Sequence, residues 1–226
     1  MEKRYLKNMT MLSESEIEKI KNSQVCVIGC GGLGGYVIEM LARLGVGNIT
    51  AVDGDIFDET NLNRQLLSDS NVIGKNKAEI AKERIALVNP LINFMPISQN
   101  INNDNGIEIL KGHDVIIDAV DNIATRLLLQ ELVYELRIIL VHGAIAGWYG
   151  QVTTIFPGDR TLDMLYAEKN MEGIEKKLGN PSFTPAFVAS VQVSETLKIL
   201  IGRGELLRNK ILYADLFAQD YEVVSL

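Results

Sequence analysis

The stretch that decides the fold is VCVIGCGGLGGYVIEMLARLGVGNITAVDGDIFDETNLNRQ, residues 25–65. It opens with a short apolar run, and Gly29, Gly31 and Gly34 follow in the spacing GxGxxG as a helical pattern begins. Glycine lets the backbone reach positive φ and approach a ligand closely, and a helix N-terminus offers free N–H groups to phosphate. A second apolar run ends at Asp53, where dinucleotide-binding units place an acidic residue for a ribose hydroxyl. The stretch therefore predicts a nucleotide site, and its alternative is a glycine-rich packing turn.

Motifs that follow in order make the prediction more specific. The glycine turn is continued by VDGD at 52–55, NLNRQ at 61–65 and GKNK at 74–77. This series resembles the ThiF, MoeB and HesA adenylyltransferases, which share their nucleotide domain with ubiquitin-activating enzymes. The resemblance runs from about Arg4 to Tyr221, nearly the whole chain. It implies ATP and Mg²⁺ as the small ligands and the C-terminal carboxylate of a small ubiquitin-like carrier as the second substrate.

Length and composition bound the fold. The chain has 226 residues, 47% of them hydrophobic, which is enough to bury a full core, and we expect one domain over residues 1–226. Its class is α/β: a Rossmann-like, mostly parallel sheet with helices on both faces and antiparallel strands at the C-terminal side. The net charge of −7 argues against nucleic acid as a partner. No apolar run is long enough to span a membrane and no signal sequence opens the chain, so we expect a cytoplasmic protein.

The elements after the opening unit can be placed from local signals. Ser13 with Glu16 predicts a capping box for a short helix ahead of the first strand. Apolar and stop patterns then predict helices at 74–88 and 123–136, strands at 91–99, 114–120 and 138–141, and an antiparallel strand at 147–156. Thr184 as N-cap with Pro185 after it predicts a helix that ends at Gly202. A hairpin at 210–226 closes the chain.

By this resemblance, the nucleotide contacts would be Gly29, Gly31, Gly32, Gly34, Asp53, Asp55, Asn61, Arg64, Gln65 and Lys77. Arg64 and Lys77 would hold phosphates during catalysis. Lys75 and Lys77 also fall in the first turn of the predicted helix 74–88, where a cation opposes the helix dipole, so a bound anion is expected there. The alternative is a pair of solvated lysines.

Asp121 follows the apolar run DVIIDAV and is expected at the carboxyl edge of the sheet, where ligands bind in such folds. The resemblance implies that it holds Mg²⁺, and the alternative is a simple N-cap for helix 123–136. Arg126, a turn further on, could be a structural ion-pair partner and is given no role. His142 is expected in the core or at a loop edge, because adenylation of a carboxylate needs no base.

Two appendages are expected, an N-terminal arm at 1–23 and a mobile loop at 157–183. In the resembled family the arm crosses to the second subunit of a homodimer and delivers an arginine to its ATP. Here Lys7 stands at that position, keeping the charge without the bidentate fork. A trans-acting Lys7 and a solvated tail both remain open.

Cysteine usage excludes two properties that many relatives have. Cys26 and Cys30 are the only cysteines, and both are expected as small core residues. No CxxC pair is present, so structural zinc and a transfer cysteine are predicted absent. The predicted function is ATP-dependent adenylylation of a carrier ending in Gly-Gly, with release of pyrophosphate. Alternatives are an inactive partner subunit of such an enzyme, an enzyme that activates a tRNA base, and an NAD-dependent oxidoreductase.

Overall fold

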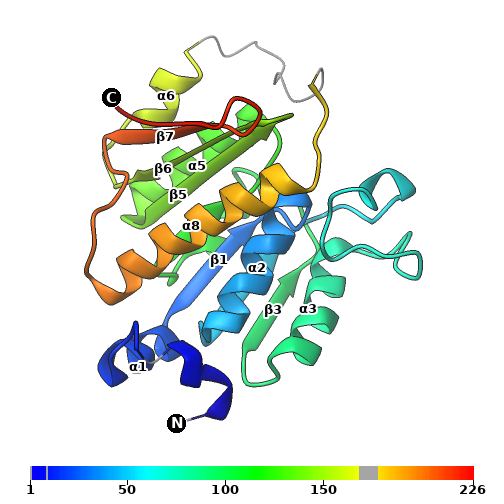
Figure 1. Ribbon diagram of the computed structural model, residues 1–226. Coiled ribbons are helices and arrows are strands. Elements are labelled where there is room, and N and C mark those ends of the chain that lie inside the picture. Colours follow the sequence, from blue (N-terminus) through cyan, green and yellow to red (C-terminus); the bar gives the residue numbers. More distant parts are fainter. Residues whose placement is uncertain (1, 9, 168–177) are drawn as a thin grey trace.

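The computed structural model describes residues 2–8, 10–167 and 178–226. Its centre is an eight-stranded sheet in the order β3-β2-β1-β4-β5-β6-β7-β8 (Figure 1). Five neighbouring strands run parallel: β3 (Asn93–Ile97), β2 (Asn48–Val52), β1 (Gln24–Ile28), β4 (Val115–Asp118) and β5 (Ile139–Ala146). The remaining strands are antiparallel: β6 (Tyr149–Ile155), β7 (Lys210–Asp215) and β8 (Asp220–Ser225). The predicted α/β class and the antiparallel C-terminal side are confirmed.

Helices cover both faces of this sheet (Figure 1). One face carries α1 (Glu14–Asn22), α2 (Gly32–Leu44), α3 (Lys77–Val88) and α8 (Phe183–Ile201). The other carries α4 (Gly106–Leu110), α5 (Ile123–Leu136) and α6 (Thr161–Leu165). Short 3₁₀ turns lie at Lys3–Asn8 (η1) and Glu59–Asn61 (η2). Two apolar clusters, one on each side of the sheet, form the core because the parallel strands are buried on both faces.

The strand order places the site. The chain runs outward from β1 through β2 to β3 and then returns to the opposite side of β1 as β4. The crossovers on the two sides of β1 therefore diverge, which opens a crevice at the carboxyl ends of β1 and β4.

Local helix signals were right in part. The capping box of Ser13 and Glu16 is present, and α5 has the predicted bounds. Helix α3 is shorter than predicted, because Asn76 caps it and Lys75 lies outside. Helix α8 begins at Phe183 with Ser182 as N-cap, so Thr184 is not the cap.

Strand β5 is longer than the predicted 138–141 because its second half, Gly143–Ala146, pairs with β6. The predicted loop 157–183 begins with α6, and residues 168–177 of it lie outside the described residues. No helix of the described ranges is both long and apolar enough to cross a bilayer.

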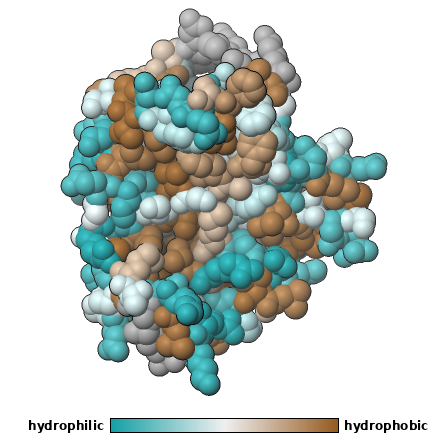
Figure 2. Space-filling view, viewed as in Figure 1, coloured by the Kyte–Doolittle hydropathy of each residue, from teal (hydrophilic) through white to brown (hydrophobic). Residues whose placement is uncertain are grey.

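Apolar side chains reach the surface on the side of α8 and the C-terminal hairpin (Figure 2). Phe217 is 76% exposed at the tip of that hairpin, and Tyr221 and Val223 of β8 are also exposed. Apolar surface of this kind is typical of a protein interaction site.

Candidate active site

A cavity of about 410 Å³ opens at the carboxyl ends of β1, β2, β4 and β5. Nine of the residues predicted for the site line it: Gly29, Gly31, Gly32, Asp53, Asp55, Arg64, Gln65, Lys77 and Asp121. Three do not, namely Gly34, Asn61 and Lys7. Segments distant in the sequence therefore meet at one edge of the sheet, as the parallel order requires.

The glycine turn connects β1 to α2, and two of its positions have no room for a side chain. Gly29 has φ +98°, and a Cβ there would lie 2.6 Å from the backbone oxygen of Ala119. A Cβ on Gly34 would lie 1.8 Å from the oxygen of Gly29, so this glycine permits close packing of the turn and does not face the cavity. Helix α2 has Gly31 as N-cap without a side-chain cap, and its first N–H groups are left for an anion.

Asp53 directly follows β2 and is held in a fixed orientation. One carboxylate oxygen accepts a hydrogen bond from Cys30 N–H at 2.7 Å, and the other accepts one from Asp55 N–H at 2.8 Å. Burial raises the pKa of the Asp53 carboxyl, against these hydrogen bonds and the charge of Lys77. Each oxygen keeps a further lone pair, so the carboxylate can still accept a ribose hydroxyl.

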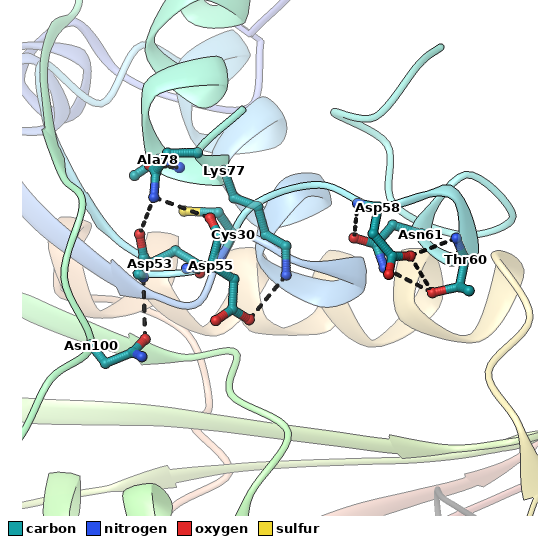
Figure 3. A network of polar contacts seen from close by, with 11 residues as sticks. Cys30, Asp53, Asp55, Asp58, Thr60, Asn61, Lys77, Ala78 and Asn100 are labelled. Atoms are coloured by element: carbon teal, nitrogen blue, oxygen red, sulfur yellow. Dashed lines mark hydrogen bonds and ion pairs between the residues drawn. The ribbon is translucent and has the colours of Figure 1, made fainter. Parts of the chain in front are cut away.

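Lys77 is a buried cation that lines the cavity beside Asp53. It is the first residue of α3, and its Nζ lies 3.2 Å from Oδ2 of Asp55 (Figure 3). The lysine side chain is 10% exposed, whereas that of Asp55 is 64% exposed. Asn76 fixes this corner, since its side-chain amide donates to the backbone oxygens of both Asp53 and Asp55. A buried ammonium whose ion-pair partner is exposed to solvent is suited to a phosphate oxygen.

The loop from Asp58 to Gln65 divides its polar residues between structure and cavity. Asn61 closes a capping box with Asp58 by accepting its N–H at 3.2 Å, and so supports η2 without lining the cavity (Figure 3). Arg64 lines the cavity and donates to Thr60 O and Asn63 Oδ1. Gln65 is 6% exposed, and its Oε1 has no hydrogen-bond partner within the described ranges. An unpaired buried oxygen beside a cavity indicates a place for a bound donor.

Asp121 lies exposed on the loop between β4 and α5. The alternative that it caps α5 is wrong, because Asn122 takes that position and accepts the N–H of Thr125 at 2.8 Å. The Asp121 carboxylate is thus not used by the helix. No group of three or more His, Cys, Asp or Glu able to hold a metal occurs in the described part of the chain. Mg²⁺ often needs only one or two protein carboxylates when phosphates supply further oxygens, so Asp121 fits such a shared site.

Several residues at the cavity were missed from the sequence. Arg126 and Asn180 line it, and each has one buried polar atom without a partner among the described residues. His142 is fully buried as expected, and its Nδ1 lies 2.6 Å from Oδ2 of Asp118. The sequence signal for Arg126 was its position in the first turn of α5, five residues after Asp121, which is expected at the cavity. Nothing local indicated Asn180.

The N-terminal arm lies at the other end of the sheet. Arg4 donates to Oδ1 of Asn89 at 2.6 Å, and the side-chain amide of Asn89 donates to the hydroxyl of Tyr5 at 2.7 Å. Tyr5 also lies against Gly45, just beyond the C-terminus of α2. Because α2 starts at the cavity and its 13 residues span about 20 Å, Lys7 is exposed far from its own cavity.

Comparisons with known proteins give relatives over most of the chain. The model of the ThiF family matches residues 4–226. The SAMP-activating enzyme E1 of Haloferax volcanii is 34% identical over 209 residues, which cover 91% of this chain and 77% of that protein. The molybdopterin-synthase adenylyltransferase of Escherichia coli is 30% identical over 214 residues, covering 92% of this chain and 85% of that protein.

Other matches show how far the likeness extends. A probable molybdopterin-synthase adenylyltransferase of Porphyra purpurea is 36% identical over 200 residues, covering 86% of this chain, which spans about half (52%) of that relative. The crystal structure of E. coli MccB with ATP superposes with a TM-score of 0.84 at 20% identity, covering 100% of this chain and 72% of that one. The fold is therefore shared with MccB, and by family model and sequence identity the chain belongs to the ThiF family.

Proposed function

We propose that the protein is an adenylyltransferase that uses ATP to activate the C-terminal carboxylate of a small ubiquitin-like or sulfur-carrier protein. The observation that carries the proposal is the convergence of the glycine turn, Asp53, Lys77, Arg64 and Asp121 on one cavity. The printed names of the relatives, adenylyltransferases and an activating enzyme, support the same reaction class. The proposal includes a carrier that ends in Gly-Gly and a cytoplasmic homodimer.

In this proposal the residues of the chain position the substrates and offset charge. Asp53 holds the ribose of the nucleoside, while the N-terminus of α2, Lys77, Arg64 and Gln65 bind phosphates. Mg²⁺, when bound by Asp121 and the phosphates, supplies further neutralisation of charge. The carrier carboxylate is already ionised at neutral pH, so no side chain has to remove a proton. The products are an acyl-adenylate and pyrophosphate.

The acyl group then has to leave on a nucleophile from outside this chain. Cys26 and Cys30 are both free thiols with no exposed surface. Burial raises the pKa of the Cys30 thiol well above its ordinary value, with the nearby Asp53 charge adding to the effect. Neither thiol is suited to forming a thioester, so the acceptor is a separate amine or sulfur donor.

Thermal shift with candidate nucleotides tests the proposal without knowledge of the carrier. We expect stabilisation by ATP with Mg²⁺, less with ATP and EDTA, and none with NAD or NADP. A ligand at 100 times its Kd stabilises a fold by about 2.7 kcal/mol. Lys77→Ala should lose the shift, whereas Lys75→Ala, an exposed lysine outside α3, should keep it.

The outcomes separate the alternatives. A shift with NAD or NADP alone would support the oxidoreductase and contradict our proposal. No shift with any nucleotide would support the inactive partner subunit. If ATP binds, pyrophosphate exchange with small ubiquitin-fold proteins ending in Gly-Gly tests the second substrate, and carriers with an amidated C-terminus should give no exchange.

A further inference from the structure

A buried arginine lies at the part of the cavity formed by β4 and β5. Arg126 of α5 is 4% exposed and lines the cavity. Its Nη2 donates to the backbone oxygen of Val120 at 2.9 Å, and its Nη1 donates to the hydroxyl of Tyr166 at 3.1 Å. Its Nε is buried without a hydrogen-bond partner in the described residues. The guanidinium is therefore oriented by neutral groups and retains a free donor.

No carboxylate of the described residues forms an ion pair with this guanidinium. Within the described ranges, the polar contacts of the Arg126 guanidinium are the hydrogen bonds to Val120 and Tyr166, and it also lies 5.5 Å from the centre of the Tyr166 ring. Asp121 lines the same cavity, but the described side chains of Asp121 and Arg126 form no ion pair with each other. Burying a charge without a counterion is costly, so the site is suited to an anion that arrives with a substrate.

A buried network behind Arg126 fixes its position. The hydroxyl of Tyr166 accepts from Arg126 and from the side-chain amide of Gln151 at 3.1 Å, and lies 3.3 Å from Nε2 of His142. Nδ1–H of His142 donates a hydrogen bond to Oδ2 of Asp118 at 2.6 Å. Nε2 is then the acceptor for the Tyr166 proton. Asp118 and His142 are fully buried and do not line the cavity, so they support Tyr166 without facing substrate.

The two parts of the cavity differ in the anions they suit. Lys77, Arg64 and the start of α2 surround the part beside Asp53 and are assigned to the phosphates above. Arg126 lies at the end of β4 and beside β5, because it donates to Val120 O and shares the Tyr166 hydroxyl with His142. Gly143, Ala144 and Ile145 of β5 line the same cavity. We propose, resting on the proposed function, that Arg126 binds the C-terminal carboxylate of the carrier protein, and that Tyr166, His142 and Asp118 position it.

The reaction step gives this contact a purpose. One carboxylate oxygen forms a bond to the α-phosphorus while the bond from that phosphorus to the oxygen bridging the β-phosphate breaks, and pyrophosphate leaves with the electron pair. Arg126 stays protonated and holds the second carboxylate oxygen. Fixing one oxygen aligns the other for attack, which is the kind of positioning that lowers the barrier by orientation.

Binding of three ligands tests the proposal by calorimetry: AMP, ATP with Mg²⁺, and 5′-O-(glycylglycylsulfamoyl)adenosine. The last carries an acyl group on a nucleotide and spreads negative charge onto its carbonyl oxygen. We expect Arg126→Gln to weaken the affinity for the acyl sulfamate about 10- to 100-fold. The affinities for AMP and for ATP should change less than about twofold. Arg126→Lys should lose less. Tyr166→Phe should lower the affinity for the acyl sulfamate about 3- to 10-fold and leave the affinities for AMP and ATP unchanged. Arg137→Gln, an exposed arginine at the end of α5, is the control and should change nothing.

Each outcome of these binding measurements supports or contradicts a contact between Arg126 and the carrier carboxylate. Equal losses for all three ligands would show that Arg126 only supports the fold, and losses for AMP and ATP alone would make phosphate its anion. Either result, or no loss at all, overturns the proposal. Failure of the wild-type protein to bind ATP would instead overturn the proposed function. If Arg126→Gln does not fold, Arg126→Lys and Tyr166→Phe decide by the same comparison.

Discussion

At the residue scale, adjacent side chains with similar chemistry have separate tasks. Asn122 caps α5, whereas the neighbouring Asp121 is exposed and has no role in the helix. We therefore expect Asp121→Asn to lower pyrophosphate exchange at least about 100-fold, the size typical for losing one charge-stabilising group. Its free energy of unfolding should change by less than about 0.5 kcal/mol.

Asn122→Ala is the matched variant, and it should cost about 1 kcal/mol of unfolding free energy through loss of the cap. Urea unfolding and exchange assays on both variants would check this division. An Asp121→Asn enzyme with wild-type exchange would remove the metal assignment.

Two histidines give a pH dependence whose sign can be worked out. Burial lowers the pKa of His113 and of His142 below the ordinary value. The hydrogen bonds that the two rings donate to Leu110 O and to the Asp118 carboxylate oppose this shift. A lowered pKa in the folded state means that the unfolded chain binds protons first. The stabilisation is therefore complete above pH of about 6.5 and is lost as the pH falls through the folded-state values.

We expect the free energy of unfolding to fall between pH 7.5 and pH 5.5, by about 1.4 kcal/mol for each unit of pKa difference. His113→Gln should remove its own part of this slope. Because Asp53 has a raised pKa and acts in the opposite direction, the comparison is between wild type and variant at each pH. Parallel curves for the two proteins would contradict the assignment to His113.

At the scale of elements, the turn between β1 and α2 depends on its third glycine. A Cβ on Gly34 would lie 1.8 Å from the oxygen of Gly29, whereas a Cβ on Gly32 would have its nearest neighbours at 3.6 Å, in the side chain of Arg64. We expect Gly34→Ala to destabilise the fold by about 3 kcal/mol, at the upper end for overpacking. Gly32→Ala should change stability by less than about 0.5 kcal/mol. Thermal unfolding of both variants measures the difference, and equal stabilities would contradict this packing role.

Most of the elements could be predicted because their signals are local. The capping box of Ser13, the bounds of α5 and the glycine turn depend on neighbours within a few residues. The errors lie where tertiary contacts decide. The sequence predicts Thr184 as a cap, but its hydroxyl donates to the backbone oxygen of Gly147 across the fold. β5 extends past the prediction because it pairs with β6, which no local pattern in β5 specifies.

The site was predictable where residues belong to motifs and not where burial comes from packing. Asp53, Lys77 and Asp121 line one cavity as their motifs implied. Asn61 belongs to the same motifs, but its side chain accepts the N–H of Asp58 in a capping box and does not line the cavity. The position of Arg126 over Tyr166 depends on α6 lying against α5, a contact between segments 40 residues apart. The residue pattern does not contain that contact.

At the scale of the whole molecule, the cavity and the N-terminal arm lie at opposite ends of the sheet. Arg4 and Tyr5 tie the arm to Asn89, beyond the end of α3, and leave Lys7 exposed. Lys7 therefore does not line the cavity of its own chain. If it contributes to nucleotide binding, it does so in a second copy of the chain, and the affinity for ATP must depend on assembly.

We expect the protein to sediment as a dimer and to lose ATP affinity on dilution as it dissociates. In the dimer, Lys7→Ala should lower the affinity for ATP about tenfold, a loss of about 1.4 kcal/mol of binding free energy, because a cation near the phosphates is removed. Lys19→Ala, an exposed lysine of α1, should leave affinity unchanged. At concentrations where the dimer has dissociated, wild type and Lys7→Ala should bind ATP equally. A monomer that binds ATP equally well with and without Lys7 at every concentration would make the arm a solvated tail, because a lysine that never approaches a phosphate contributes no binding energy.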